Sequence, residues 1–149
     1  VLRQPLLYLS LYFKQNRADY YRLLDAVRTT GDWESWLDFF LTGVRDTGSA
    51  AVETAHRLLA LFETDTETIQ DVGRSAGNIL RVFHTLRRRP VATIDYLADA
   101  SGVSYATAVR AVRTLTEIGL LRELTGRRRG RVFAYDRYLV ILSEGAQPL

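Results

Sequence analysis

The chain has 149 residues, a formal net charge of +3, no cysteine and no methionine. This length allows one domain or two small ones, and the missing cysteines exclude disulfides and thiolate metal sites. No apolar run is long enough to span a membrane and no signal peptide is visible, so we expect a cytoplasmic protein with no membrane partner. Because there is no starting methionine, we expect the chain to be part of a longer protein.

Charge is divided unevenly along the chain. Residues 1–75 carry 8 basic and 11 acidic side chains, whereas residues 76–149 carry 12 basic and 6 acidic ones. Lys14 is the single lysine, and all other basic residues are arginines. A basic half after an acidic half indicates two functional regions and a polyanionic partner for the second. An arginine-rich composition with a solvated face is the alternative explanation.

Helices dominate the first half of the predicted structure. Residues 1–13 are strongly apolar and include Pro5, which suits the start of a helix, so we expect this segment to be largely buried. A second helix is predicted over residues 18–30. Gly31 ends it, and Asp32 can cap the helix that follows.

The next helix carries apolar residues at three- and four-residue intervals: Trp33, Trp36, Leu37, Phe40, Leu41 and Val44. This stripe predicts core packing, with a subunit or domain interface as the alternative. Gly48 and Ser49 can kink or break the helix, and the apolar spacing continues to Phe62 as one helix or two.

A polar stretch over residues 63–70 is the expected junction between two domains, 1–70 and 71–149. A further apolar stripe from Ile69 to Leu86 predicts the helix that leads into the second domain, and Pro90 stops it.

Residues 91–135 predict a helix-turn-helix followed by a two-stranded wing. Thr93 suits the N-cap of the first helix, Gly102 suits the left-handed position of the turn, and Ser104 suits the N-cap of the second helix. Gly119 stops the second helix. Strands are predicted over residues 120–124 and 132–135, around the arginine-rich loop at 125–130. Asp136 can then cap a last short helix over residues 137–143.

The spacing of this segment resembles that of winged helix-turn-helix domains. The matching residues are Leu97, Ala98, Gly102, Val103, Ser104, Thr107, Leu115, Gly119, Leu120 and Leu121. In such a domain the second helix faces the major groove and the wing lies beside the DNA backbone. The resemblance therefore predicts contacts to nucleic acid from Ser104, Tyr105, Thr107, Arg110, Arg113, Arg127, Arg128, Arg129 and Arg131. Thr114 is also expected to face outward, and Ala106 and Ala111 limit the hydrogen-bonding power of the helix face.

The first half resembles the helices that follow the active-site loop in Fic-family proteins (filamentation induced by cAMP). The residues that carry the resemblance are Leu7, Tyr8, Leu9, Ser10, Asn16, Arg17, Asp19, Tyr20, Tyr21, Leu24, Val27, Gly31, Asp32, Trp33, Trp36, Phe39, Phe40, Leu41, Gly43 and Val44. Many Fic proteins carry a winged helix after this region, and residues 132–142 resemble the end of such proteins.

The Fic resemblance implies an enzymatic activity whose sequence motif is absent from this chain. Fic enzymes transfer AMP from ATP to protein hydroxyls, with Mg²⁺, through a His-Pro-Phe-x-Asp/Glu-Gly-Asn-Gly-Arg motif that this chain lacks. Its two histidines are His56 and His84, and neither is followed by proline. The resemblance therefore implies a C-terminal piece of a longer adenylyltransferase, so we expect no catalytic residue, metal site or cofactor in this chain, which is not an enzyme by itself.

The fold class predicted is mainly α: a helical-bundle remnant of a Fic core, then a winged helix-turn-helix. Three functions are consistent with these sequence patterns and resemblances. The first is a regulatory, DNA-binding region of a Fic-type protein adenylyltransferase, whose parent protein also has a protein target. The second is a winged helix used for protein interaction or dimerisation, including a homodimer. The third is a stand-alone transcriptional regulator.

Overall fold

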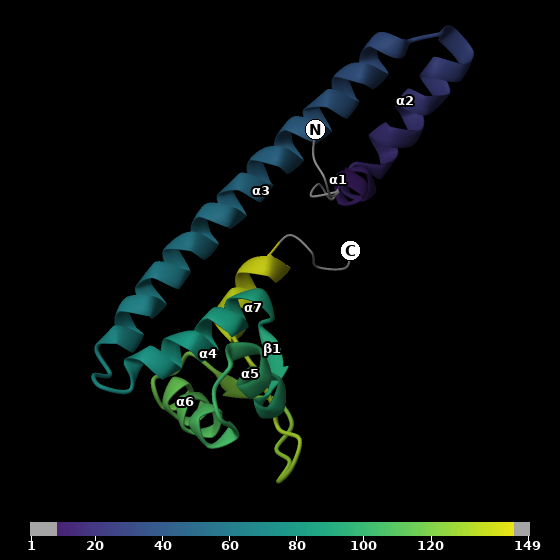
Figure 1. The fold of residues 1–149 in the computed structure, drawn as a ribbon. Helices are drawn as coiled ribbons and strands as arrows, with labels where there is room; N and C mark the ends of the chain where they lie inside the picture. Colours follow the sequence, from purple (N-terminus) through teal and green to yellow (C-terminus); the bar gives the residue numbers. More distant parts are fainter. Residues whose placement is uncertain (1–8, 145–149) are drawn as a thin grey trace. The chain divides into compact units, whose positions relative to one another are not determined.

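The structure is a computed structural model that describes residues 9–144, and Figure 1 labels its elements. In chain order these are α1 (Leu9–Gln15), α2 (Arg17–Thr30), α3 (Trp33–Gln70), α4 (Ala76–Arg88), β1 (Val91–Thr93), α5 (Ile94–Ser101), α6 (Tyr105–Glu117), β2 (Arg122–Glu123), β3 (Val132–Ala134) and α7 (Asp136–Ser143). The predicted mainly α fold with a winged helix-turn-helix is confirmed. The chain forms two compact units, one up to His56 and one from Arg57 onward. None of the helices among residues 9–144 is long and apolar enough to cross a membrane.

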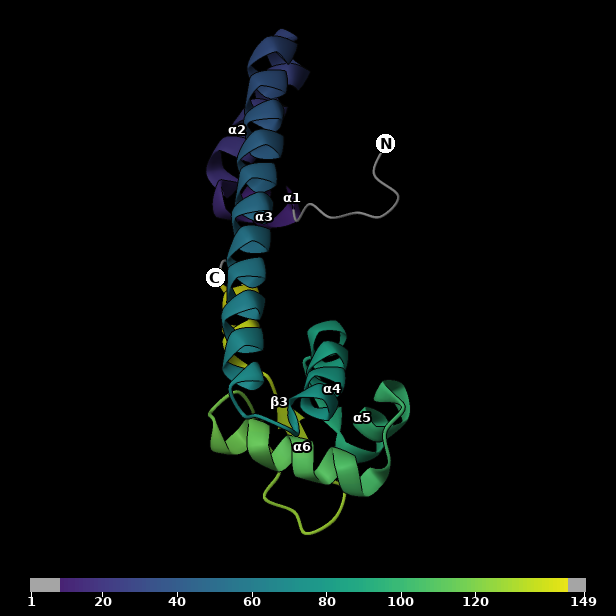
Figure 2. The ribbon, with the colours of Figure 1, turned by 60° about the vertical axis from the view of Figure 1, so that its left-hand side comes forward.

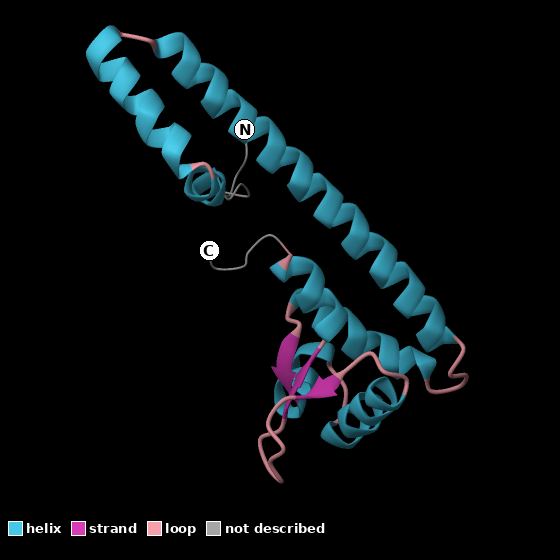
Figure 3. Ribbon diagram, turned by 180° about the vertical axis from the view of Figure 1, so that it is seen from behind, coloured by secondary structure: helices cyan, strands magenta, loops and turns pink. Residues whose placement is uncertain are grey.

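The first unit is built on a helical hairpin, in which α2 runs back beside the first part of α3 (Figure 3). Gly31 closes α2 with φ of 71°, a conformation that glycine adopts without strain, and its N–H donates to Val27 O at 3.1 Å. Asp32 then accepts a hydrogen bond from the Ser35 N–H at 3.1 Å, which confirms the predicted cap. A two-residue connection of this kind brings consecutive helices together in antiparallel fashion.

Aromatic rings fill the space between the helices of the first unit. Phe13 of α1 lies 5.9 Å from Phe39 between ring centroids, and Tyr20 of α2 lies 5.5 Å from Trp36. Gly43 allows this packing, because a Cβ atom there would lie 2.6 Å from the Tyr12 ring.

The prediction that the whole Trp33–Val44 stripe is core is wrong. Trp33 is 60% exposed, Leu37 50% and Leu41 62%. The reason is that α1 and α2 cover the face of α3 that carries Trp36, Phe39 and Phe40. The predicted start of a helix at Pro5 lies outside the described residues.

Helix α3 is continuous through Gly48 and Ser49, so the apolar spacing belongs to one helix of 38 residues. Its polar last part is regular helix as well, and there threonine hydroxyls donate to backbone carbonyls four residues earlier. Thr64 bonds Ala60 O at 3.0 Å, and Thr68 bonds Thr64 O at 3.0 Å.

The expected single helical stripe from Ile69 to Leu86 is interrupted. Gly73, with φ of 88°, lies in a turn between α3 and α4. A domain boundary between residues 70 and 71 stays a prediction.

The second unit packs α4, α5 and α6 against one another and against a small sheet. The sheet has three strands in the order β1-β3-β2, all antiparallel, with Val91 opposite Ala134 and Arg122 also opposite Ala134. Strand β1 was not predicted, because its three residues carry no alternation that would distinguish them from a loop. The buried core includes Leu61, Phe62, Ile69, Ile79, Phe83, Leu86, Leu97, Val112, Leu115, Phe133 and Tyr135.

The last described helix, α7, does not use the predicted cap. Asp136 is its first residue, Tyr135 occupies the N-cap position, and no side chain caps the helix. The Asp136 carboxylate instead accepts hydrogen bonds from the Arg122 guanidinium. An acidic residue in the first turn still interacts favourably with the helix dipole.

Candidate nucleic-acid interface

The turn between α5 and α6 has the local geometry that the sequence predicts. Thr93 Oγ1 accepts from the Tyr96 N–H at 3.3 Å, and Ser104 Oγ accepts from the Thr107 N–H at 3.2 Å, so both N-caps are confirmed. Gly102 has φ of 64° and ends α5. The turn is also held from α4, because Arg81 Nη2 donates to Gly102 O at 3.0 Å.

Small buried residues let the helices approach closely. Ala98 of α5 and Ala108 and Ala111 of α6 all lie in the core. Ala111 was expected on the outward face of the second helix, and that expectation is wrong. Thr114, also expected outside, is half-buried. The core face of α6 is therefore wider than its apolar stripe alone suggested.

The exposed side of α6 presents two arginines and a tyrosine. Tyr105 is 55% exposed at the start of the helix, and Arg110 and Arg113 are exposed further along. Arg113 pairs with Glu117 at 3.7 Å, a surface contact of little energetic weight. Arg110 lies 3.4 Å from Thr107 Oγ1. These long side chains can reorient without disturbing the core.

The hydroxyls of Ser104 and Thr107 are occupied within the protein. They lie 2.8 Å apart, and Ser104 also serves as the N-cap. Thr107 is half-buried. Of the predicted contact residues on α6, Tyr105, Arg110 and Arg113 therefore have the most freedom to reach a ligand.

The wing is a loop between β2 and β3 that turns through two glycines. Gly126 has φ of 59° and Gly130 has φ of 63°, so both adopt the left-handed conformation that side chains disfavour. The loop is closed by the Leu124 N–H, which donates to Val132 O at 2.8 Å. Between the glycines lie three exposed arginines with no hydrogen bond or ion pair to residues 9–144: Arg127, Arg128 and Arg129. Three adjacent guanidinium groups thus project from one tight loop.

Arg131 differs from these three arginines because it lies at the base of the wing. Its guanidinium lies 3.7 Å from the Glu123 carboxylate and 5.4 Å from the centre of the Phe133 ring. The side chain is half-buried. Its position favours a role in fixing the wing strands over a role at the loop tip.

Helix α6 and the wing lie beside each other (Figure 2). A hollow of about 260 Å³ separates them, with Val109, Arg113 and Thr116 from α6 on one side and Arg131 and Phe133 on the other. Arg113 of α6 and Arg131 of the wing, two of the predicted contact residues, therefore line the same hollow.

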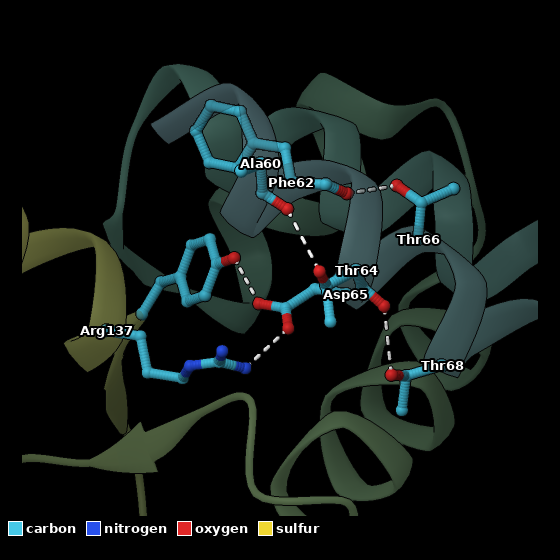
Figure 4. Close-up of polar contacts among 8 residues, drawn as sticks. Ala60, Phe62, Thr64, Asp65, Thr66, Thr68 and Arg137 are labelled. Carbon is cyan, nitrogen blue, oxygen red and sulfur yellow. Dashed lines mark hydrogen bonds and ion pairs between the residues drawn. The ribbon is translucent and has the colours of Figure 1, made fainter. Parts of the chain in front are cut away.

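A buried polar cluster fixes the far end of β3, and sequence reasoning missed it. Asp65 of α3 is fully buried, and its carboxylate accepts hydrogen bonds from the Tyr135 hydroxyl and, at 2.5 Å, from Arg137 Nη1 (Figure 4). Burial raises the pKa of Tyr135, and the hydrogen bond to Asp65 adds to the shift. The cluster joins residues about 70 positions apart, so no local pattern indicates it.

Among known protein families, the IclR helix-turn-helix domain matches residues 75–125, about a third of the chain. The matched stretch runs from the residue before α4 through β2, and so includes the complete helix-turn-helix. The chain therefore contains an IclR-type helix-turn-helix DNA-binding domain. The match does not reach the residues that resemble the Fic family, so that resemblance stays a prediction.

Proposed function

We propose that this chain is a DNA-binding transcription regulator that acts by binding and not by catalysis. In this proposal α6 lies in the major groove, where Arg110 and Arg113 read base edges. The wing arginines Arg127–Arg129 contact phosphates. The observation that carries the proposal is the IclR-type match over a helix-turn-helix whose outward helix face is exposed and carries arginines.

Arginine suits both roles. Its planar guanidinium donates two parallel hydrogen bonds to the O6 and N7 atoms of guanine, or to phosphate oxygens. A good bidentate contact discriminates against the wrong base by about 1–3 kcal/mol. We therefore expect the α6 arginines to carry sequence preference and the wing arginines to carry sequence-independent affinity.

A regulator is a better supported proposal than a region of a Fic-type adenylyltransferase. The family match concerns DNA-binding helix-turn-helix domains, whereas the Fic hypothesis rests on the resemblance of the first half and of residues 132–142, which lie outside the match. Detection of AMP transfer by a longer form of the protein would favour the hypothesis that the chain is a region of a Fic-type adenylyltransferase.

The test is fluorescence anisotropy of the whole chain on a labelled duplex across a salt series. Each phosphate contact adds about 0.9 to the slope of log affinity against log salt concentration. Changing Arg127, Arg128 and Arg129 to alanine is expected to lower that slope by about 2 to 3. No binding at low salt would refute the proposal.

The matched control changes three exposed arginines of α2, Arg17, Arg22 and Arg28, to alanine. This variant loses the same net charge in the other compact unit. If it lowered the slope as much as the wing variant does, general charge and not the wing would be responsible for affinity. A change of Arg110 and Arg113 to alanine is expected to reduce the preference between duplexes of different sequence.

A further inference from the structure

Helix α3 carries an uncovered apolar stripe in the first compact unit. We define the α3 stripe by six residues: Trp33, Leu37, Leu41, Val44, Gly48 and Val52. Val52 is 56% exposed, and Trp33, Leu37 and Leu41 are at least half exposed. Single exposed apolar residues are common on protein surfaces, but a continuous row is typical of an interaction surface.

Packing against α1 and α2 accounts for the apolar residues on the face of α3 that carries Trp36, Phe39 and Phe40. It does not account for the apolar residues of the α3 stripe. Gly43 is needed where the Tyr12 ring approaches the helix, whereas a Cβ atom at Gly48 would meet nothing within 4 Å. A glycine in a helix interior lowers helix stability relative to alanine. Gly48 therefore has no function in the packing among residues 9–144, although it lies in the middle of the apolar row.

The spacing of the α3 stripe is symmetric. Its intervals are four, four, three, four and four residues, so the row reads the same from both ends. A second α3 lying antiparallel on this stripe would place Trp33 opposite Val52, Leu37 opposite Gly48, and Leu41 opposite Val44. The open space at Gly48 would then receive a leucine. A parallel second helix would place Gly48 against Gly48 and leave a gap.

Charge complementarity favours the same arrangement. Asp38 and Arg45 lie along one edge of the stripe, and in an antiparallel pair this edge faces the equivalent edge of the second helix. The symmetry that aligns the apolar residues brings Asp38 close to Arg45 of the second copy, and does so twice. Within the chain Arg45 pairs with the adjacent Asp46 at 2.9 Å, and both side chains are largely exposed.

We propose that two copies of this chain pair antiparallel through the α3 stripe. The contact runs from Trp33 to Val52, a length of about 28 Å along the helix. A closed two-fold contact uses the same patch on both subunits, which the symmetric spacing provides. The pairing does not depend on DNA binding, although paired helix-turn-helix units commonly bind two half-sites.

The first test measures the mass of the whole chain in solution by sedimentation equilibrium at micromolar concentrations. A dimer is expected, and Leu37→Glu is expected to make it monomeric by placing two carboxylates in the apolar contact. Leu37 is half exposed, so this variant keeps the fold, which circular dichroism checks. If the unsubstituted chain were a monomer, the proposal would be wrong, and a different partner would cover the α3 stripe.

Leu59→Glu is the matched control. Leu59 lies on the same side of α3 and is 54% exposed, but its symmetric position would fall before the start of the helix. This variant is expected to remain a dimer. If Leu59→Glu dissociated the dimer as strongly as Leu37→Glu, the proposed register would be wrong.

A charge exchange tests the antiparallel direction. Asp38→Arg and Arg45→Asp each remove both predicted ion pairs, and each is expected to weaken the dimer on the order of 10-fold. The double variant Asp38→Arg, Arg45→Asp restores opposite charges and is expected to recover most of the loss. A double variant as weak as the single variants would overturn the proposed pairing.

Discussion

Replacing Asp65 by asparagine keeps the side-chain volume but removes the buried charge that Tyr135 and Arg137 share. An amide has only one acceptor oxygen, so one of the two donors loses its partner. Breaking a buried ion pair costs about 3–5 kcal/mol. Since the Arg137 side chain is 52% exposed and can be rehydrated, we expect a loss of about 2–3 kcal/mol in the free energy of unfolding.

A loss of this size is easy to measure. One kcal/mol lowers the melting temperature of a domain of 60–100 residues by about 4–8 °C, so thermal unfolding of Asp65→Asn is expected about 10–20 °C lower. Near-ultraviolet circular dichroism follows the packing of aromatic side chains in both units, and those of the second unit include Phe62, Phe83 and Tyr135. The matched control is Glu67→Gln, the same kind of charge removal at an exposed residue two positions after Asp65 on α3. Its expected effect on the free energy of unfolding is within about 0.5 kcal/mol. Equal melting temperatures for the two variants would refute the idea that the buried cluster stabilises the fold.

Three further predictions concern single residues. Because the Tyr135 pKa is raised in the folded state, stability is full below the ordinary tyrosine pKa of about 10 and falls as pH rises above it. Tyr135→Phe is expected to reduce the fall of stability with pH, measured by urea unfolding between about pH 8 and 11. If stability fell with pH as steeply in the variant, Tyr135 would not be the group responsible. Gly102→Ala is expected to cost about 1–2 kcal/mol, because φ of 64° strains an alanine and its Cβ would lie 3.1 Å from Arg81. Equal midpoints in urea unfolding would argue against strain at this turn. Gly48→Leu is expected to weaken the dimer at least 10-fold, since the space for Leu37 is filled; an unchanged dissociation constant in sedimentation would contradict the pairing.

Local features of the helix-turn-helix could be predicted because each depends on a few neighbouring residues. Thr93, Ser104 and Gly102 act on the backbone within three positions of themselves, and the structure confirms all three. The wing was also visible, because short apolar runs flank a loop that contains two glycines. Strand β1 was not, since three residues become a strand only through pairing with β3, about 40 positions later.

Non-local features could not be derived from spacing. The pattern on α3 correctly indicates apolar residues at helical intervals, but it does not say which of them α1 and α2 cover. Trp36 therefore packs against Tyr20, while Trp33, three residues earlier, is exposed. The partners of Asp65 are similarly hidden, because only the folded chain brings Tyr135 and Arg137 to it.

The wing loop has a consequence for proteolysis. Three consecutive arginines on an exposed loop provide adjacent cleavage sites for trypsin, which cuts after basic residues in accessible chain segments. Cleavage there would separate β2 from β3 without removing any core residue. If the guanidinium groups lie against DNA, the duplex shields the same peptide bonds, so the rate of the first tryptic cut becomes a direct measure of how much of the protein is bound.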